Sequence, residues 1–142
     1  MDEIEKITSW ILTFPQWPKS AKLEVDHIDP GGAGLFPLGL QEIRRDEDLL
    51  GNQRIVCRWR ALLVVSVDEK ESGMKSAAFL TDFEKWVYEQ NGQGMLPRLG
   101  DGYVYVRAEN GQRVKIRQPG LAVYSTELSV EFTKYYEVRE NG

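Results

Sequence analysis

The sequence feature that most constrains the fold is an alternation of apolar and polar residues from Arg54 to Asp68. One side of this segment is apolar throughout and holds Ile55, Cys57, Trp59, Ala61, Leu63, Val65 and Val67. A two-residue period is typical of a β-strand, because successive side chains point to opposite faces of a sheet. The other side begins polar and becomes apolar at Leu62 and Val64. We therefore expect a strand with one face buried along its length and the other covered only at its second end.

A second long strand is predicted from Pro119-Gly120 to about Val138. Its even-numbered positions are mainly apolar, with Lys134 as the exception: Tyr124, Thr126, Leu128, Val130, Phe132, Tyr136 and Val138. Before it, Asn110-Gly111 predicts a two-residue hairpin between strands at 103–109 and 112–118, because both central residues of a type I′ turn need a positive φ.

Two segments have the spacing of amphipathic helices. Within residues 2–14 the apolar positions are Ile4, Ile7, Ile11 and Phe14, and within residues 74–90 they are Phe79, Phe83, Trp86 and Val87. Asn91-Gly92 is expected to end the second helix, since glycine is common just past a last helical turn. The stripe of the first helix fits packing on the domain or binding in a partner's groove, and the second stripe would lie against a sheet.

Shorter signals complete the predicted order of elements. Lys22 to Ile28 alternates like a short strand, and Asp29 to Gly34 breaks regular structure. Residues 40–52 form a polar hairpin that turns at Gly51-Asn52 and is either solvated or covered by another chain. The order helix, strand, long hairpin, helix, hairpin, strand predicts an α+β fold: an antiparallel or mixed sheet with two main helices packed on it, in a single domain over residues 1–142.

Candidate chemistry centres on His27, the only histidine, which lies between Asp26 and Asp29. An imidazole and two carboxylates suit a metal, but the same residues fit a strand that ends in a turn. Cys57, the only cysteine, lies on the apolar strand face, which favours a buried structural thiol. The sequence contains no Gly-x-Ser-x-Gly elbow and no phosphate-binding Gly-Lys-Ser/Thr. We therefore predict no catalytic residue, no cofactor and no metal site, and hence not an enzyme.

The charge balance bears on partners. Acidic residues outnumber basic ones by 22 to 18, which disfavours polyphosphate and anionic membranes. No apolar run approaches the roughly 20 residues that span a bilayer, and the acidic first residues differ from a secretory signal. We expect neither a specific nucleic acid nor a membrane as partner.

Arginines gather on one face of the strand at 54–68, where Glu127 and Glu131 of the last strand could pair with them across the sheet or across a subunit boundary. A nucleic-acid groove and a plain solvated face are the alternatives. Two further arginines and two acids lie in the polar hairpin. The residues predicted to form a subunit or partner interface are Arg44, Arg45, Asp46, Glu47, Arg54, Arg58, Arg60, Glu127 and Glu131.

Several segments also carry a family resemblance. They are residues 79–86 (FLTDFEKW), Glu89-Gln90-Asn91, residues 96–100 (LPRLG), Val25-Asp26, residues 34–37 (GLFP) and Tyr135-Tyr136 at the end of the last strand. In these segments the chain resembles the minor capsid or tail-terminator-type proteins of long-tailed phages and prophages. The matching motifs are packing and turn motifs.

The resemblance implies a tail-terminator-like fold and a role in assembly. The subunit would form a ring-like homo-oligomer, with a hexamer as one option, at the head-proximal end of the tail. Its partners would be the tail-tube protein and a head-tail connector protein. It would be located in the virion tail after assembly in the cytoplasm of the bacterial host. The alternatives are a head-tail joining protein, or a small metal- or ligand-binding α+β domain that uses the Asp26-His27-Asp29 loop.

Overall fold

The structure is a computed structural model that describes residues 3–18, 21–68, 76–114 and 121–137. Its elements are α1 (Glu3–Ile11), β1 (Leu23–Val25), β2 (Ala33–Glu47), β3 (Gln53–Asp68), α2 (Ser76–Gln93), β4 (Val104–Val114) and β5 (Leu121–Tyr136). The strands form one sheet in the order β1-β2-β3-β5-β4. β1 is parallel to β2 and the other neighbours are antiparallel. The chain is thus an α+β protein with two helices packed on a mixed sheet, as the sequence predicts.

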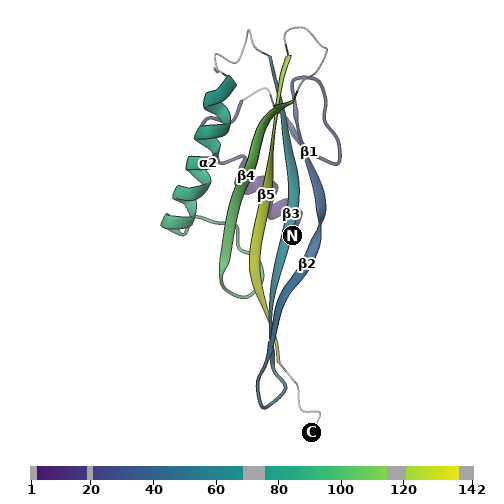
Figure 1. The fold of residues 1–142 in the computed structure, drawn as a ribbon, viewed down its shortest axis with the longest axis vertical. Helices are drawn as coiled ribbons and strands as arrows, with labels where there is room; N and C mark the ends of the chain where they lie inside the picture. The colour runs from purple at the N-terminus through teal and green to yellow at the C-terminus, as the bar shows by residue number, and fades with distance from the viewer. Residues whose placement is uncertain (1–2, 19–20, 69–75, 115–120, 138–142) are drawn as a thin grey trace.

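Both long alternating strands are confirmed, and they lie side by side at the centre of the sheet (Figure 1). The predicted apolar side of β3 is buried at Ile55, Cys57, Trp59, Ala61, Leu63 and Val65. Opposite them β5 buries Tyr124, Thr126, Leu128, Val130 and Phe132. The second face of β3 is half-covered at Leu62 and Val64, as expected, whereas Arg54 and Arg60 are exposed.

The two helices cover the same face of the sheet, since their side chains belong to one hydrophobic cluster with β3 and β5. From α1 and the turn after it come Ile7, Trp10, Ile11 and Phe14, and from α2 come Phe79, Phe83, Trp86 and Val87. The rings of Trp10 and Trp86 stack with their centroids 4.8 Å apart. The stripe of α1 therefore packs on the domain itself. Neither helix, as far as the structure describes them, is long and apolar enough to cross a bilayer.

The end of the β2–β3 hairpin, with β5 beside β3, extends past β4 and α2 (Figure 1). Every residue from Leu38 to Leu50 is exposed within this chain, as a hairpin that is either solvated or covered by another chain requires. The turn lies at Asp48–Asn52, where Gly51 has a φ of 87°. β1 is shorter than expected, because Asp26 adopts a φ of 58° and ends the extended backbone after Val25.

The prediction of a hairpin at Asn110-Gly111 is wrong. Both residues lie inside the single strand β4, where the register shifts between Glu109 and Gln112 opposite β5. Asn110 does adopt the positive φ, 54°, that the sequence suggested, but in a β-bulge, one type of which also uses the left-handed conformation. The connection from β4 to β5 falls at residues 115–120, outside the described residues. The final part of the chain therefore contains two strands and not three.

The prediction that the second helix ends at Asn91-Gly92 is also wrong. α2 continues through Asn91 and Gly92 to Gln93, and the glycine that follows the helix in the left-handed conformation is Gly94, with a φ of 68°. Asn91 does not cap the helix. Its side chain leaves α2 to bind strand β4, as described below. Met74 and the charged connection at 69–73 lie outside the described residues.

Candidate interaction surface

The sheet face that points away from the helices is covered by charged side chains on three adjacent strands. The pairing aligns them in rows across β3, β5 and β4. The rows are Arg58, Glu131 and Tyr105; Arg60, Ser129 and Arg107; and Leu62, Glu127 and Glu109. We call the polar members of these rows the charged face. It arises because the polar positions of three alternating strands fall on one side.

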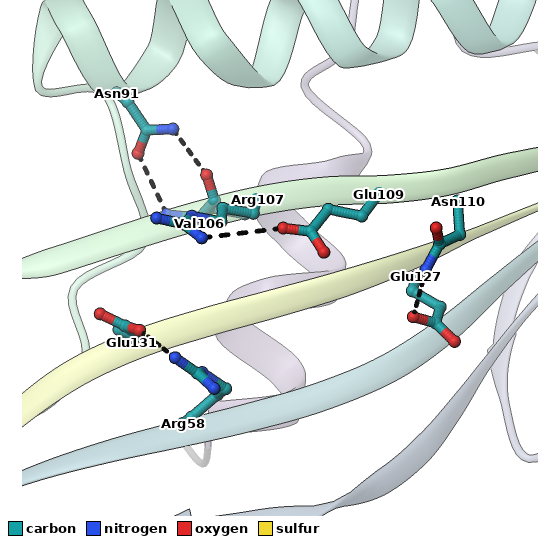
Figure 2. A network of polar contacts seen from close by, with 8 residues as sticks. All are labelled: Arg58, Asn91, Val106, Arg107, Glu109, Asn110, Glu127 and Glu131. Atoms are coloured by element: carbon teal, nitrogen blue, oxygen red, sulfur yellow. Dashed lines mark hydrogen bonds and ion pairs between the residues drawn. The ribbon is translucent and has the colours of Figure 1, made fainter. Parts of the chain in front are cut away.

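The strongest interaction of the charged face joins Arg58 to Glu131. The Arg58 Nη2 atom donates to Glu131 Oε1 at 2.7 Å, and both side chains are partly buried (Figure 2). Pairing of Glu131 with an arginine of β3 across the sheet, one of the predicted options, is confirmed within one chain. By contrast, the structure gives Arg60 no ion pair with any described residue.

The β4 side of the charged face was missed at the sequence level. Arg107 Nη1 lies 3.8 Å from Glu109 Oε1, and Asn110 Nδ2 donates to Glu127 Oε2 at 3.0 Å (Figure 2). The Arg107 guanidinium also lies over the ring of Tyr105, 5.2 Å from its centroid. Placing a turn at Asn110-Gly111 hid this side, because it assigned residues 103–109 and 112–118 to different strands. The alternation of Tyr105, Arg107 and Glu109 was the available signal.

A cavity of about 160 Å³ lies on the charged face. Ser129 lines it, between Arg60 and Arg107 on the neighbouring strands and between Glu127 and Glu131 along β5. Three arginines and three glutamates line the cavity in all. Acids and bases are interleaved on this face, so that it offers polar contacts in several directions without a strong net field.

The remaining predicted interface residues lie at the far end of the hairpin, around Arg54. Asp46 accepts from Arg44 at 3.0 Å and lies 3.7 Å from Arg54. Arg45 donates to Glu42 at 2.6 Å, and this hydrogen bond lowers the pKa of the Glu42 carboxyl. Glu47 is exposed beside the turn. The nine predicted residues therefore form two groups: Arg44, Arg45, Asp46, Glu47 and Arg54 on the hairpin, and Arg58, Arg60, Glu127 and Glu131 on the charged face.

The two edges of the sheet differ. At the β4 edge, Asn91 of α2 acts like a short piece of strand: its Nδ2 donates to Val106 O at 2.6 Å and its Oδ1 accepts from Val106 N at 3.1 Å (Figure 2). At the other edge, β1 pairs with β2 only at Ala33–Leu35. Beyond that point β2 carries Pro37 and two register shifts, features that hinder the addition of another strand.

The single histidine belongs to an exposed cluster near the end of β1. His27 Nε2 lies 2.7 Å from Asp29 Oδ1 and 3.4 Å from Glu24 Oε2. Among the described residues, these three are the one group whose ligand atoms lie close enough to hold a metal ion. Glu24, and not Asp26, completes the group. The hydrogen bond to Asp29 raises the pKa of His27. Cys57 is buried and free, as expected.

Comparison of the sequence with models of known protein families and with curated proteins found no match.

Proposed function

We propose that this chain is a structural assembly protein of a long-tailed phage or prophage, of the tail-terminator or minor structural type. In this role it oligomerises, as a ring, at the head-proximal end of the tail, binds the tail-tube protein and docks the head through a connector protein. It acts in the virion tail after assembly in the host cytoplasm, and it is not an enzyme. The proposal starts from the resemblance in residues 79–100 and in the last strand.

The observation that carries the proposal furthest is the combination of the charged face with a long exposed hairpin. A subunit that is soluble alone and later meets several neighbours needs surfaces of mixed charge, because such surfaces favour correct partners without driving nonspecific aggregation. Every residue of the hairpin from Leu38 to Leu50 is exposed within this chain, so contact with another molecule could bury this surface. A projecting arm and a charged face suit assembly better than catalysis on a small molecule.

The test is co-assembly with a tail-tube protein from the genome that encodes this chain. We expect the protein to bind polymerised tubes at one end only, which electron microscopy with a labelled protein would show, and to stop further growth of the bound end. Failure to bind tubes at any protein concentration would contradict the proposed function. A head-tail joining protein would instead bind the head connector complex and ignore the tubes.

A second candidate function rests on the Glu24, His27 and Asp29 cluster, which could hold a divalent cation at the surface. Isothermal titration with Zn²⁺, Mn²⁺ and Ca²⁺ would test it, with His27→Ala as the variant and Asp26→Asn as the control. Saturable binding that only His27→Ala abolishes would support a metal-binding domain. The assembly function predicts no such dependence of tube binding on His27.

A further inference from the structure

The tip of the β2–β3 hairpin presents two adjacent leucines to solvent. Leu49 is fully exposed and Leu50 is 79% exposed. Removing a leucine side chain from water is favourable, so an exposed leucine forgoes that free energy. A single exposed leucine is nevertheless common on protein surfaces. Two adjacent leucines in the turn past the last paired residues of β2, β3 and β5 form an apolar knob, and we call Leu49 and Leu50 the tip leucines.

The turn that carries the tip leucines is held by a dense set of hydrogen bonds to Asp48. Its Oδ1 accepts from Leu50 N and from Asn52 N, each at 2.9 Å, and its Oδ2 accepts from Asn52 Nδ2 at 3.0 Å. These hydrogen bonds lower the pKa of Asp48, with the Asn52 side chain as the largest cause. The knob is therefore preorganised, which reduces the entropy lost when it binds.

A groove of mixed polar and apolar lining lies elsewhere on the same chain, between the end of α2 and the start of β4. It has a volume of about 440 Å³ and is lined by Gly94, Leu96, Pro97, Arg98, Leu99, Gly100, Gly102 and Val104. Its backbone is fixed to the domain: Met95 O accepts from Trp10 Nε1 at 2.9 Å, and Asp101 N donates to Thr133 O at 2.8 Å. The groove is thus formed before any partner arrives.

The charges that line each cavity indicate that this groove suits the knob better than the other two cavities do. Asp46 is paired with Arg44 and Arg54, and the acids directly before the tip leucines are Glu47 and Asp48, so the knob approaches with two acidic neighbours. Arg98 is the only charged residue that lines the groove. The cavity at the base of the tip holds four acids against one arginine, namely Asp46, Glu47, Asp48, Glu137 and Arg54, and would repel a second tip. The cavity of the charged face is mostly polar.

We propose that the tip leucines of one copy insert into the groove between α2 and β4 of a second copy. This contact rests on the self-association that is part of the proposed function and names its geometry. The contact uses side chains and not strand addition, which Pro37 and two register shifts hinder at the β2 edge and which Asn91 blocks at Val106 on the β4 edge. Because knob and groove are different surfaces, the contact is head-to-tail, and repetition closes a ring if the rotation between copies permits it.

Two variants test the contact from its two sides. Leu49→Asn with Leu50→Asn removes the knob at exposed positions. Gly102→Leu fills the groove, at a residue where an added Cβ meets only Tyr135 Cε2 at 3.9 Å and the backbone is not left-handed. Tyr88→Ser, on α2 and 78% exposed, is the control matched to Leu50. Self-association is measured by sedimentation and native mass spectrometry over a concentration series.

We expect each of the two variants to self-associate at least about tenfold more weakly than the wild type, as burial of leucine side chains requires, and the control to behave as the wild type. The decisive sample is the equimolar mixture. The knob of the Gly102→Leu chain still fits the groove of the leucine-less chain, so the mixture forms one-to-one dimers and nothing larger. Wild-type association by the leucine-less variant, or a monomeric mixture, overturns the contact.

A charge exchange between Arg98 and Glu47 tests the same contact without Gly102→Leu, in case that variant disturbs the fold. Arg98→Glu weakens association, and Glu47→Lys in the same chain restores it, because both residues are exposed and the pair is exchanged across the contact. If Glu47→Lys does not restore the association that Arg98→Glu weakens, the contact is overturned. Oligomers that persist without the tip leucines and still bind tail tubes contradict this contact alone, whereas oligomers that depend on the tip but ignore tubes contradict only the proposed function.

Discussion

Arg58 and Glu131 lie directly opposite each other on β3 and β5, and a hydrogen bond of 2.7 Å joins their side chains although 73 residues separate them in sequence. The pair sits on the charged face with both groups partly buried. It therefore couples the two central strands on the side that the helices do not cover. Cross-strand ion pairs of this kind contribute a few tenths to about 1 kcal/mol.

A double-mutant cycle of Arg58→Gln and Glu131→Gln should give a coupling energy of about 0.5–1 kcal/mol in favour of the native pair. The reason is that each charge loses its partner in the single variants. Urea unfolding at low and at high salt measures it, and the coupling should fall as salt rises. Arg60→Gln with Glu131→Gln is the control, since no ion pair joins these two residues. Equal coupling in both cycles would contradict the prediction.

Asn91→Ala should destabilise the protein by about 1–3 kcal/mol, the usual cost of leaving buried polar groups unpaired. Asn91 satisfies both the N–H and the C=O of Val106 on the β4 edge. Thermal or denaturant unfolding measures the loss, and hydrogen exchange at the Val106 amide should accelerate as well. Glu89→Ala, at an exposed position of the same helix, should change neither quantity. Unaltered exchange at Val106 would show that the side chain does not protect this edge.

Substitution by alanine should have opposite effects on the stability of the protein at Gly100 and at Gly92. Gly100 has a φ of 62° and its added Cβ would collide with the Thr133 carbonyl oxygen, so Gly100→Ala should cost more than the roughly 1–2 kcal/mol of a left-handed residue alone. Gly92 lies inside α2, where a Cβ meets nothing within 4 Å. Gly92→Ala should therefore stabilise the protein by up to about 1 kcal/mol. Denaturant midpoints would decide, and a stabilising Gly100→Ala would refute the close approach.

The central strands could be predicted from the sequence because their alternation extends over at least ten residues and one face is buried throughout. Ile55 to Val65 and Tyr124 to Phe132 confirm this directly. The pairing of Arg58 with Glu131 was anticipated only as one option, since periodicity gives the face of a residue but neither the strand order nor the register.

The two errors share a physical cause: one local signal can serve two structures. Asn110-Gly111 supplies the positive φ that a tight turn needs, and one type of bulge uses it too. Asn91-Gly92 is typical of a helix end, but Asn91 binds a strand that only the tertiary fold brings near. The groove between α2 and β4 was not anticipated either, because its walls come from a loop without periodicity.

The exposed imidazole of His27 offers a titration that needs no assignment, since the chain has one histidine. Asp29 Oδ1 lies 2.7 Å from His27 Nε2, and Glu24 adds a weaker attraction from 3.4 Å. Both favour the protonated ring, and the Asp29 hydrogen bond is the largest cause of the raised pKa of His27. Asp26 is the neighbour in sequence but is not among these causes.

We predict that His27 titrates above its ordinary pKa of 6.5 in the folded protein, as an NMR titration of its ring protons would show. Because the folded pKa exceeds the unfolded one, the protonated ring adds stability that is fully present below about pH 6.5 and is lost as the pH rises through the raised value. Asp29→Asn should return the pKa toward 6.5. Asp26→Asn should leave it nearly unchanged, since asparagine also tolerates the φ of 58° at that position. A wild-type pKa at or below 6.5, or equal shifts in the two variants, would contradict the role of Asp29.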